Sequence, residues 1–308
     1  MKTALDTSFN DLEQFMQEVQ HWDLDFRILD TGGFLCRLKQ LVSRDVLVSY
    51  VRFQRSLDQA GATPPGYRTF GIIGKTCNGF WWRGQQVSCN DLLVFPPSNE
   101  LKSVSHGDFE VFTVSLHSIY LEQLVNDLGI AIDPISKHEV IPLEPRVIHE
   151  LRTLAGMIVN STNSAATSAI SQALAEKLLI STNTGISGKR APLRRRDLAI
   201  DRVAEYIRST PAPVSDSANL CRIASVSERT LQYAFMERYG IPPNVYVRWW
   251  NLNTARRLLI QANPVEATVN DIAVSLGFLH GGQFAADYRK LFSELPSTTL
   301  DSKGQTPN

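Results

Sequence analysis

The sequence predicts a two-domain α+β protein, in which a strand-rich domain with helices precedes an all-helical domain. Three observations predict this order. The length of 308 residues favours two domains over one. Short apolar or alternating runs fill residues 26–116, whereas helical periodicity dominates from residue 118 onward. The stretch STNTGISGKRAPLRRR (181–196), rich in Gly, Ser and Arg and without periodicity, separates the two parts.

The composition is that of an ordinary globular chain, with 43% hydrophobic and 20% charged residues. No apolar run is long enough for a membrane span, which needs about 18 residues or more. The N-terminal stretch MKTALDTSFNDLEQF is acidic and lacks the apolar core of a signal peptide. The four cysteines show no C-x-x-C spacing and read as reduced thiols. We therefore expect a cytoplasmic protein without a membrane partner.

The first domain is expected to begin with an amphipathic helix over residues 9–22. Gly, Pro, Asn and Ser then punctuate short apolar runs, as in an antiparallel sandwich or small barrel. Helical periodicity returns at 118–128 and again from 144 to about 180. The expected strands include residues 47–53, 68–73, 79–84, 91–97 and 109–116.

The second domain is expected to be helical throughout, with polar, frayed chain from Pro296 onward. Its charge differs from that of the first domain. Residues 1–188 hold 15 Lys and Arg against 20 Asp and Glu, whereas residues 189–297 hold 15 against 10. A basic second half indicates a polyanionic partner, although an excess of this size also arises by chance. The expected helices span 196–209, 217–224, 228–239, 243–262, 269–276 and 281–292.

The helical domain contains an internal repeat. A small residue, Ser225 and then Gly277, recurs at an offset of 52, and the positions after it recur at an offset of 53. Each copy reads as helix, tight turn, helix, which is the layout of a helix-turn-helix. Two copies joined by the helix 243–262 would offer two reading helices to DNA; the alternative is a bundle in which the hairpins only pack. The matched positions are Leu231, Phe235, Tyr239, Gly240 and Pro243 in the first copy, and Phe284, Tyr288, Phe292, Ser293 and Pro296 in the second.

The residues from Leu198 to Leu300 resemble the two-motif DNA-binding domain of AraC-type (AraC/XylS) transcription regulators. The motifs that carry the resemblance are SERTLQYAF, the connecting helix with ARRLL at 255–259, and Ala273 followed by Leu276-Gly277-Phe278. The resemblance implies promoter binding by two helix-turn-helix motifs in adjacent major-groove segments, and regulation of transcription. It also implies contacts with RNA polymerase.

The resemblance places the base-reading positions of the first motif on Arg229, Gln232 and Tyr233. Arg suits guanine, Gln suits adenine, and Tyr suits a thymine methyl or a phosphate. The second reading helix opens with HGGQ, so we expect it to anchor more than it specifies, because glycine N–H groups suit a phosphate. Arg257 is expected in a structural ion pair. The expected DNA-binding residues are Arg229, Thr230, Gln232, Tyr233, His280, Gly281, Gly282, Gln283 and Ala286, with phosphate contacts from Arg195, Arg196, Arg248, Arg256 and Arg289.

The resemblance also implies that the first domain is a cupin-like β-barrel that senses a small-molecule effector and forms a homodimer. The expected division is 1–182 for this domain, 183–195 for the linker and 196–300 for the DNA-binding domain. Trp81, Trp82 and Arg83 are the candidate ligand-binding residues, although adjacent strand residues face opposite ways, so only one tryptophan can face inward. The helical stretch 118–180 is the candidate dimer interface, and packing against the barrel is its alternative.

Two other classes of function are alternatives to the regulator. One is a cupin-type metal-dependent enzyme with a helical accessory domain. The six histidines contain no His-x-His pair, which disfavours it, so no metal, cofactor or catalytic residue is expected. The other is a module whose helical repeat binds a partner helix. Salt-dependent DNA binding separates that module from the regulator.

Overall fold

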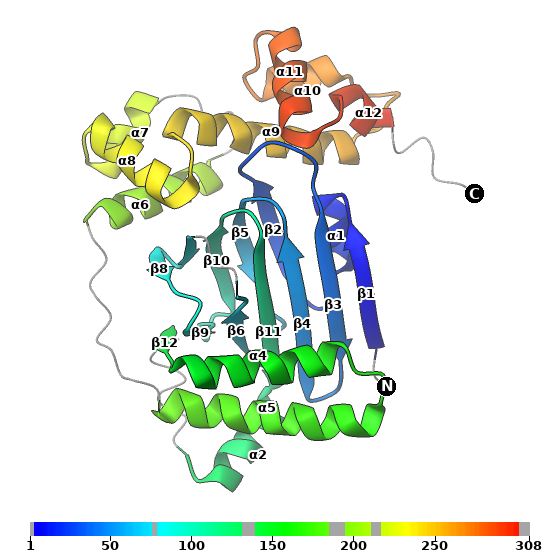
Figure 1. The fold of residues 1–308 in the computed structure, drawn as a ribbon. Coiled ribbons are helices and arrows are strands. Elements are labelled where there is room, and N and C mark those ends of the chain that lie inside the picture. Colours follow the sequence, from blue (N-terminus) through cyan, green and yellow to red (C-terminus); the bar gives the residue numbers. More distant parts are fainter. Residues whose placement is uncertain (1–2, 76–78, 131–138, 185–194, 211–216, 302–308) are drawn as a thin grey trace. The chain divides into compact units, whose positions relative to one another are not determined.

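The computed structural model describes residues 3–75, 79–130, 139–184, 195–210 and 217–301 (Figure 1). The chain divides into two compact units. Unit 1 comprises Met1–Phe26, Leu35–Gln54 and Gln59–Ala191, and unit 2 comprises Arg27–Phe34, Arg55–Asp58 and Pro192–Asn308. A sheet-rich part thus precedes a helical part, as the α+β prediction requires. Two short N-terminal segments nevertheless belong to the helical unit, which the sequence did not predict.

The strands form two sheets whose order is not the order of the sequence. One sheet has the order β1-β3-β4-β11-β6-β9-β12, and the other has the order β2-β5-β10-β7-β8. The first comprises β1 (Thr3–Phe9), β3 (Cys36–Val42), β4 (Val46–Phe53), β11 (Phe109–His117), β6 (Tyr67–Ile73), β9 (Asp91–Val94) and β12 (Val140–Pro142). The second comprises β2 (Asp23–Ile28), β5 (Leu57–Ala62), β10 (Glu100–Ser105), β7 (Phe80–Trp82) and β8 (Gln85–Val87).

The two faces of the seven-stranded sheet pack against different partners. Alternate residues of its central strands, including Val48, Phe70 and Val114, belong to a core shared with helices. Their neighbours Ser49, Gly71 and Thr113 point the other way and line a pocket together with residues of the five-stranded sheet. This alternation is the period of two expected for strands, and it makes unit 1 a helix layer and two sheets.

In the residues that the structure describes, four helices accompany the sheets of unit 1. They are α1 (Leu12–Glu18), α2 (Ser118–Leu128), α4 (Pro145–Val159) and α5 (Ser164–Thr184). Figure 1 shows α4 and α5 running side by side next to the seven-stranded sheet. Their inward residues are fully buried and complete the core: Ile148, Leu151, Ala155, Ile158, Leu174, Leu178 and Leu179.

The barrel predicted for this domain appears as two sheets. Within the described ranges the strands form two separate sheets, and no strand pairing between the two sheets closes them into a barrel. The described elements differ in detail from the sequence analysis at four places. Residues 3–9 form the edge strand β1, the first helix spans Leu12–Glu18 rather than 9–22, and the helical region 144–180 consists of α4 and α5. The chain from Pro296 forms a further helix instead of fraying, because Pro296, Thr299 and Leu300 are buried.

Unit 2 contains seven helices in its described residues, arranged around the long helix α9. Figure 1 shows one group of helices at each end of α9. The first group is α6 (Arg195–Ser209), α7 (Ser217–Ala224) and α8 (Glu228–Tyr239), and the second is α10 (Val269–Ser275), α11 (Gly281–Phe292) and α12 (Pro296–Asp301), with α9 spanning Pro243–Gln261.

The short segment Arg55–Asp58 ties into the core of unit 2. Asp58 is only 3% exposed. Its carboxylate accepts hydrogen bonds from the Tyr246 hydroxyl at 2.6 Å and from Arg208 at 2.8 Å. A buried carboxylate is stable only when it is paired in this way, so these contacts hold the segment to α9 and α6.

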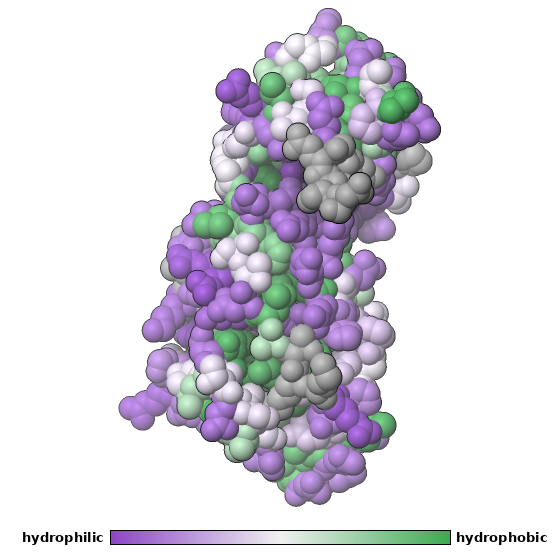
Figure 2. Space-filling model, turned by 90° about the vertical axis from the view of Figure 1, so that its right-hand side faces the viewer, coloured by the Kyte–Doolittle hydropathy of each residue, from purple (hydrophilic) through white to green (hydrophobic). Residues whose placement is uncertain are grey.

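Exposed hydrophobic side chains are scattered over several elements, for example Ile119, Met157 and Leu258. Figure 2 shows one face of the molecule, where hydrophobic residues form small groups among hydrophilic ones. Across the part of the chain that the structure describes, no helix has both the length and the apolar content to cross a bilayer.

Candidate nucleic-acid interface

Each group of helices in unit 2 contains a pair joined by a tight turn, α7–α8 and α10–α11. Both turns place a residue in the left-handed backbone region, Ser225 with φ 54° and Gly277 with φ 78°. Both second helices end on a left-handed C-cap, Gly240 with φ 71° and Ser293 with φ 63°. The two copies of the sequence repeat therefore share the same backbone conformation at the turn and at the C-cap. The positive φ at each turn changes the direction of the chain between the first and the second helix.

Helix α8, the expected recognition helix of the first pair, is fixed by its cap and by one apolar face. The Ser227 hydroxyl accepts a hydrogen bond from the backbone N–H of Thr230 at 3.3 Å. Leu231 and Phe235, four residues apart, are buried in unit 2. These contacts leave the opposite face of the helix open to solvent.

The open face of α8 presents Arg229, Gln232, Tyr233 and Met236. Tyr233 is 61% exposed, which is high for an aromatic side chain. The Arg229 guanidinium carbon lies 5.6 Å from the centroid of the Tyr233 ring, and the Gln232 amide donates to the Glu228 carboxylate at 3.4 Å. These are hydrogen-bond donors and apolar groups of the kinds that read base edges in a major groove. Thr230 is half-buried beside them.

Helix α11, the second helix of the second pair, begins differently. Its N-cap is His280, which makes no side-chain capping hydrogen bond. Gly281 and Gly282 follow, both exposed, and a Cβ added at Gly282 would meet nothing within 4 Å. Gln283 and Ala286 are also exposed, one turn of helix apart. The start of α11 is therefore an uncrowded surface on which the backbone itself is accessible.

An acidic residue on α11 links this helix to α9. Asp287 accepts a hydrogen bond from Gln283 at 3.1 Å and forms an ion pair with Arg248 of α9. The Arg248 side chain is 43% exposed, so its guanidinium lies at the surface beside α11. Arg248 can contact a phosphate only if its guanidinium binds Asp287 and the phosphate together, or if its ion pair with Asp287 breaks.

The other arginines expected at phosphates lie in different surroundings. Arg196 pairs with Glu237 at 2.8 Å and is 35% exposed, and Arg289 is exposed on α11. Arg195 is the first residue of α6, and its side chain lies outside the described residues.

Arg256 does not lie in the surroundings expected for it. Arg256 is only 8% exposed, forms an ion pair with Glu294 and lies 4.9 Å from the Phe292 ring centroid. Arg257 is half-buried. A buried, paired guanidinium is not available to a phosphate, which corrects the phosphate contact expected of Arg256. The error has a simple cause, since adjacent helix residues differ by about 100° in direction.

Sequence reasoning missed a buried arginine that supports α8. Arg238, in the last turn of α8, is 2% exposed and donates to Asp201 of α6 at 2.6 Å. An arginine at this position normally reads as a solvated residue near the helix C-terminus. Its position four residues after Ala234, on the apolar stripe, is the signal that it points inward.

The ligand-binding residues expected in unit 1 fall in three places. Trp82 lines the pocket between the sheets, whereas Trp81 is buried but does not line it. Arg83 lies outside the pocket and pairs with Glu100 at 2.7 Å and Glu139 at 3.1 Å. In the described part of the chain, no group of three or more His, Cys, Asp or Glu side chains is placed to hold a metal ion.

Comparisons with known proteins place these motifs in a family. A family model described as "Helix-turn-helix domain" matches residues 220–302. The "XylDLEGF operon transcriptional activator 2" of Pseudomonas putida is 31% identical over 127 residues, which are 41% of this chain and 80% of that protein.

Two further proteins extend the comparison. The "XylDLEGF operon transcriptional activator 1" of Pseudomonas putida is 26% identical over 233 residues, 71% of this chain and 68% of that protein. The solved "probable AraC family transcriptional regulator" of Rhodopseudomonas palustris is 34% identical; its match covers 34% of this chain and 96% of that one, with a TM-score of 0.32. The two helix-turn-helix motifs and the likeness to the Pseudomonas activators agree, and this chain belongs to the AraC/XylS family of DNA-binding transcription regulators.

Proposed function

We propose that this regulator reads promoter DNA by placing α8 and α11 in adjacent segments of the major groove. The exposed group Arg229, Gln232 and Tyr233 on α8 is the observation that carries the proposal. A capped helix held by Leu231 and Phe235 presents these side chains away from the core. The base-reading role belongs to α8, because its side chains can distinguish base pairs in the major groove.

The second helix contributes affinity more than sequence preference. Its start carries Gly281 and Gly282, which have no side chain to read a base, and the exposed backbone N–H groups suit a phosphate. Gln283 and Ala286 are its groove-facing residues, and His280 lies beside them. Arg196, Arg248 and Arg289, with Arg195 at the start of α6, supply further phosphate contacts.

The base-reading role of α8 is tested with the full chain and a random duplex library. The bound sequences are selected, and affinities for the selected site and for mutated sites are measured by fluorescence anisotropy at fixed salt. Arg229→Ala should weaken binding to the selected site by about 1–3 kcal/mol and relax the preference at one base pair. Affinity should also fall as salt rises, because phosphate contacts release counterions.

Arg37→Ala is the control, since it removes the same charge from an exposed arginine of unit 1. It should leave both affinity and base preference unchanged. An Arg229→Ala protein that keeps full selectivity would remove Arg229 from the reading set.

The remaining features of the proposal concern unit 1 and assembly. We place the homodimer contact on α4 and α5, whose outer faces leave Met157 and Ile180 exposed, although packing on the sheet already occupies their inner faces. Dimerisation would raise DNA affinity by linking two contacts. The two facing sheets, which we interpret as a cupin-like arrangement, hold the pocket for a small effector. Contact with RNA polymerase, and a cytoplasmic location beside the DNA, complete the proposal.

A further inference from the structure

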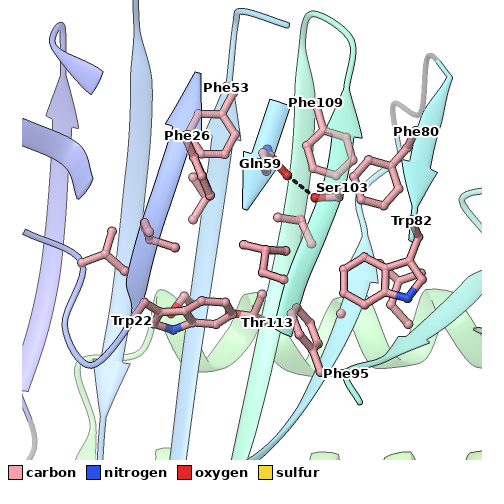
Figure 3. A pocket seen from close by; sticks show the side chains of 18 of the residues that line it. Trp22, Phe26, Phe53, Gln59, Phe80, Trp82, Phe95, Ser103, Phe109 and Thr113 are labelled. Carbon is pink, nitrogen blue, oxygen red and sulfur yellow. Dashed lines mark hydrogen bonds between the residues drawn. The ribbon is translucent and has the colours of Figure 1, made fainter. Parts of the chain in front are cut away.

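The pocket of unit 1 lies between its two sheets, and several aromatic side chains line it. It encloses a cavity of about 70 Å³. Figure 3 shows Trp22 and Trp82 on opposite sides of it with Phe95 between them. The two indoles contact Phe95 edge-on, at centroid distances of 5.8 Å for Trp22 and 4.6 Å for Trp82. The lining is therefore suited to a flat apolar molecule.

Several polar groups in the lining already have protein partners. The Ser103 hydroxyl donates to the Gln59 side-chain carbonyl at 2.6 Å, as drawn in Figure 3, and the Gln59 amide donates to Ser105 at 3.2 Å. The Ser49 hydroxyl accepts from Gln40 at 3.0 Å. These bonds join neighbouring strands within each sheet, so each of these groups already has a protein partner.

Three other polar atoms of the lining are buried and have no protein partner. They are the indole nitrogens of Trp22 and Trp82 and the hydroxyl of Thr113. Trp82 is 1% exposed and Thr113 is 9% exposed. A buried N–H without an acceptor costs about 1–3 kcal/mol, so an acceptor brought by a ligand would recover free energy here. An indole N–H can only donate, which fixes the ligand group as an acceptor.

Charge is absent from the lining as described. All the lining residues of the pocket that the structure describes are neutral, and most are aromatic or aliphatic. Arg83, one residue from Trp82, turns away to Glu100 and Glu139. A carboxylate placed between the sheets would lose its hydration with no cation to replace it, which is costly in an apolar site.

We propose that this pocket binds an uncharged molecule of at most one substituted ring, whose single hydrogen-bond acceptor takes the N–H of Trp82 or Trp22. The cavity sets the upper limit of size. A dry cavity of about 150 Å³ accommodates benzene, so this cavity of about 70 Å³ must roughly double in volume to admit one ring and excludes larger molecules. The inference rests on the proposed sensing role of unit 1, and it names the chemical class that unit 1 senses.

The test uses the full chain and three probes of nearly the same shape: acetophenone, benzoate and α-methylstyrene. Acetophenone carries a neutral acceptor, benzoate carries a charge, and α-methylstyrene carries neither. Isothermal titration calorimetry at pH 7.5 should show benzoate binding about tenfold or more weakly than acetophenone, because the anion loses its hydration. α-Methylstyrene should bind about fivefold more weakly than acetophenone, the worth of one net hydrogen bond.

Variants then identify the donor. Trp82→Phe or Trp22→Phe should bring the ratio of acetophenone to α-methylstyrene affinity close to one, because the ratio cancels the change in cavity size. Trp81→Phe is the matched control, since Trp81 is buried beside Trp82 but does not line the pocket. Thr113→Val, which preserves shape, tests the hydroxyl in the same way and covers the case in which a tryptophan variant fails to fold.

Four results would overturn the inference: no binding of any probe, benzoate binding as tightly as acetophenone, an unchanged ratio in both tryptophan variants, or a ratio that changes only in Thr113→Val. The calorimetry contains no DNA, so its failure leaves the Arg229→Ala result standing. Conversely, loss of the base-reading role of Arg229 leaves the ligand selectivity standing.

Discussion

Arg256 and Arg257 are neighbours on α9, but Arg256 is buried against the Glu294 carboxylate whereas Arg257 is half-buried. Its ion pair with Glu294 and its hydrogen bond to the Tyr288 hydroxyl at 3.5 Å connect α9 to α11 and to the turn after it. Arg256→Leu should lower the free energy of unfolding by about 2 kcal/mol, because Glu294 is left partly buried without its cation. Urea unfolding of the full chain, followed by circular dichroism, measures the change.

Arg257→Leu is the matched control for this comparison, since it makes the same substitution one position along the same helix. It should cost clearly less than Arg256→Leu, because Arg257 is half-exposed. Equal losses from the two variants would mean that the Glu294 pair contributes nothing specific. Which of the two arginines faces the core depends on the rotation of α9 about its axis, and the apolar spacing of this stretch does not determine that rotation.

At the scale of elements, the start of α11 holds a residue with a low helix propensity. Gly282 sits in the first turn, exposed, with room for a Cβ. Gly282→Ala should therefore raise the free energy of unfolding by about 0.5–1 kcal/mol, the helix-propensity difference. If the backbone approaches a phosphate closely, the same change should weaken DNA binding. Stability from urea unfolding and affinity from anisotropy should thus move in opposite directions.

Gly156→Ala is the matched control for Gly282→Ala, since it makes the same change within α4 of unit 1, where an added Cβ meets only the Phe112 ring at 3.9 Å. This control should leave DNA affinity unchanged, so stability and affinity should not move in opposite directions. A Gly282→Ala protein that gains stability and keeps full DNA affinity would show that the glycine has no role at the DNA backbone.

The elements of unit 2 were predictable because their signals are local. Leu231 with Phe235 and Phe284 with Tyr288 each mark one helix face within four residues, and the repeat relates the two copies. The pocket of unit 1 was not predictable in this way. Trp22, Trp82 and Thr113 come from three distant parts of the chain, and only sheet pairing brings them together. Alternation in FWW, which places Phe80 and Trp82 on one face, was the one signal that pointed to it.

At the scale of the whole molecule, the sequence predicted the order of the two domains but not the composition of the helical unit. Asp58 lies in β5, 188 positions before Tyr246, and no spacing rule connects them. The contact nevertheless places a carboxylate among buried phenols. The stability of the helical unit therefore depends on a residue of the strand-rich sequence, and its pH dependence follows from that placement.

The phenols around Asp58 predict a loss of stability in alkali. Burial raises the pKa of Tyr239 from 10.0 to about 12, with a smaller contribution from Asp58. Burial, and then Asp58, also holds the pKa of Tyr246 well above 10.0. The unfolded chain releases these protons near pH 10 while the folded chain keeps them. The stabilisation is therefore complete below pH 10 and is lost as the pH rises from 10 toward 12.

Urea unfolding of the full chain between pH 9 and pH 11.5 measures this loss, and absorbance at 295 nm follows phenolate formation in the folded protein. Tyr239 alone should contribute on the order of 2 kcal/mol by pH 12, because one pKa unit corresponds to about 1.4 kcal/mol. Tyr239→Phe should flatten the fall, whereas Tyr233→Phe, on the exposed face of α8, should not change it. If wild type and Tyr239→Phe lose stability with the same slope, the buried phenols near Asp58 do not govern the alkaline limit of the fold.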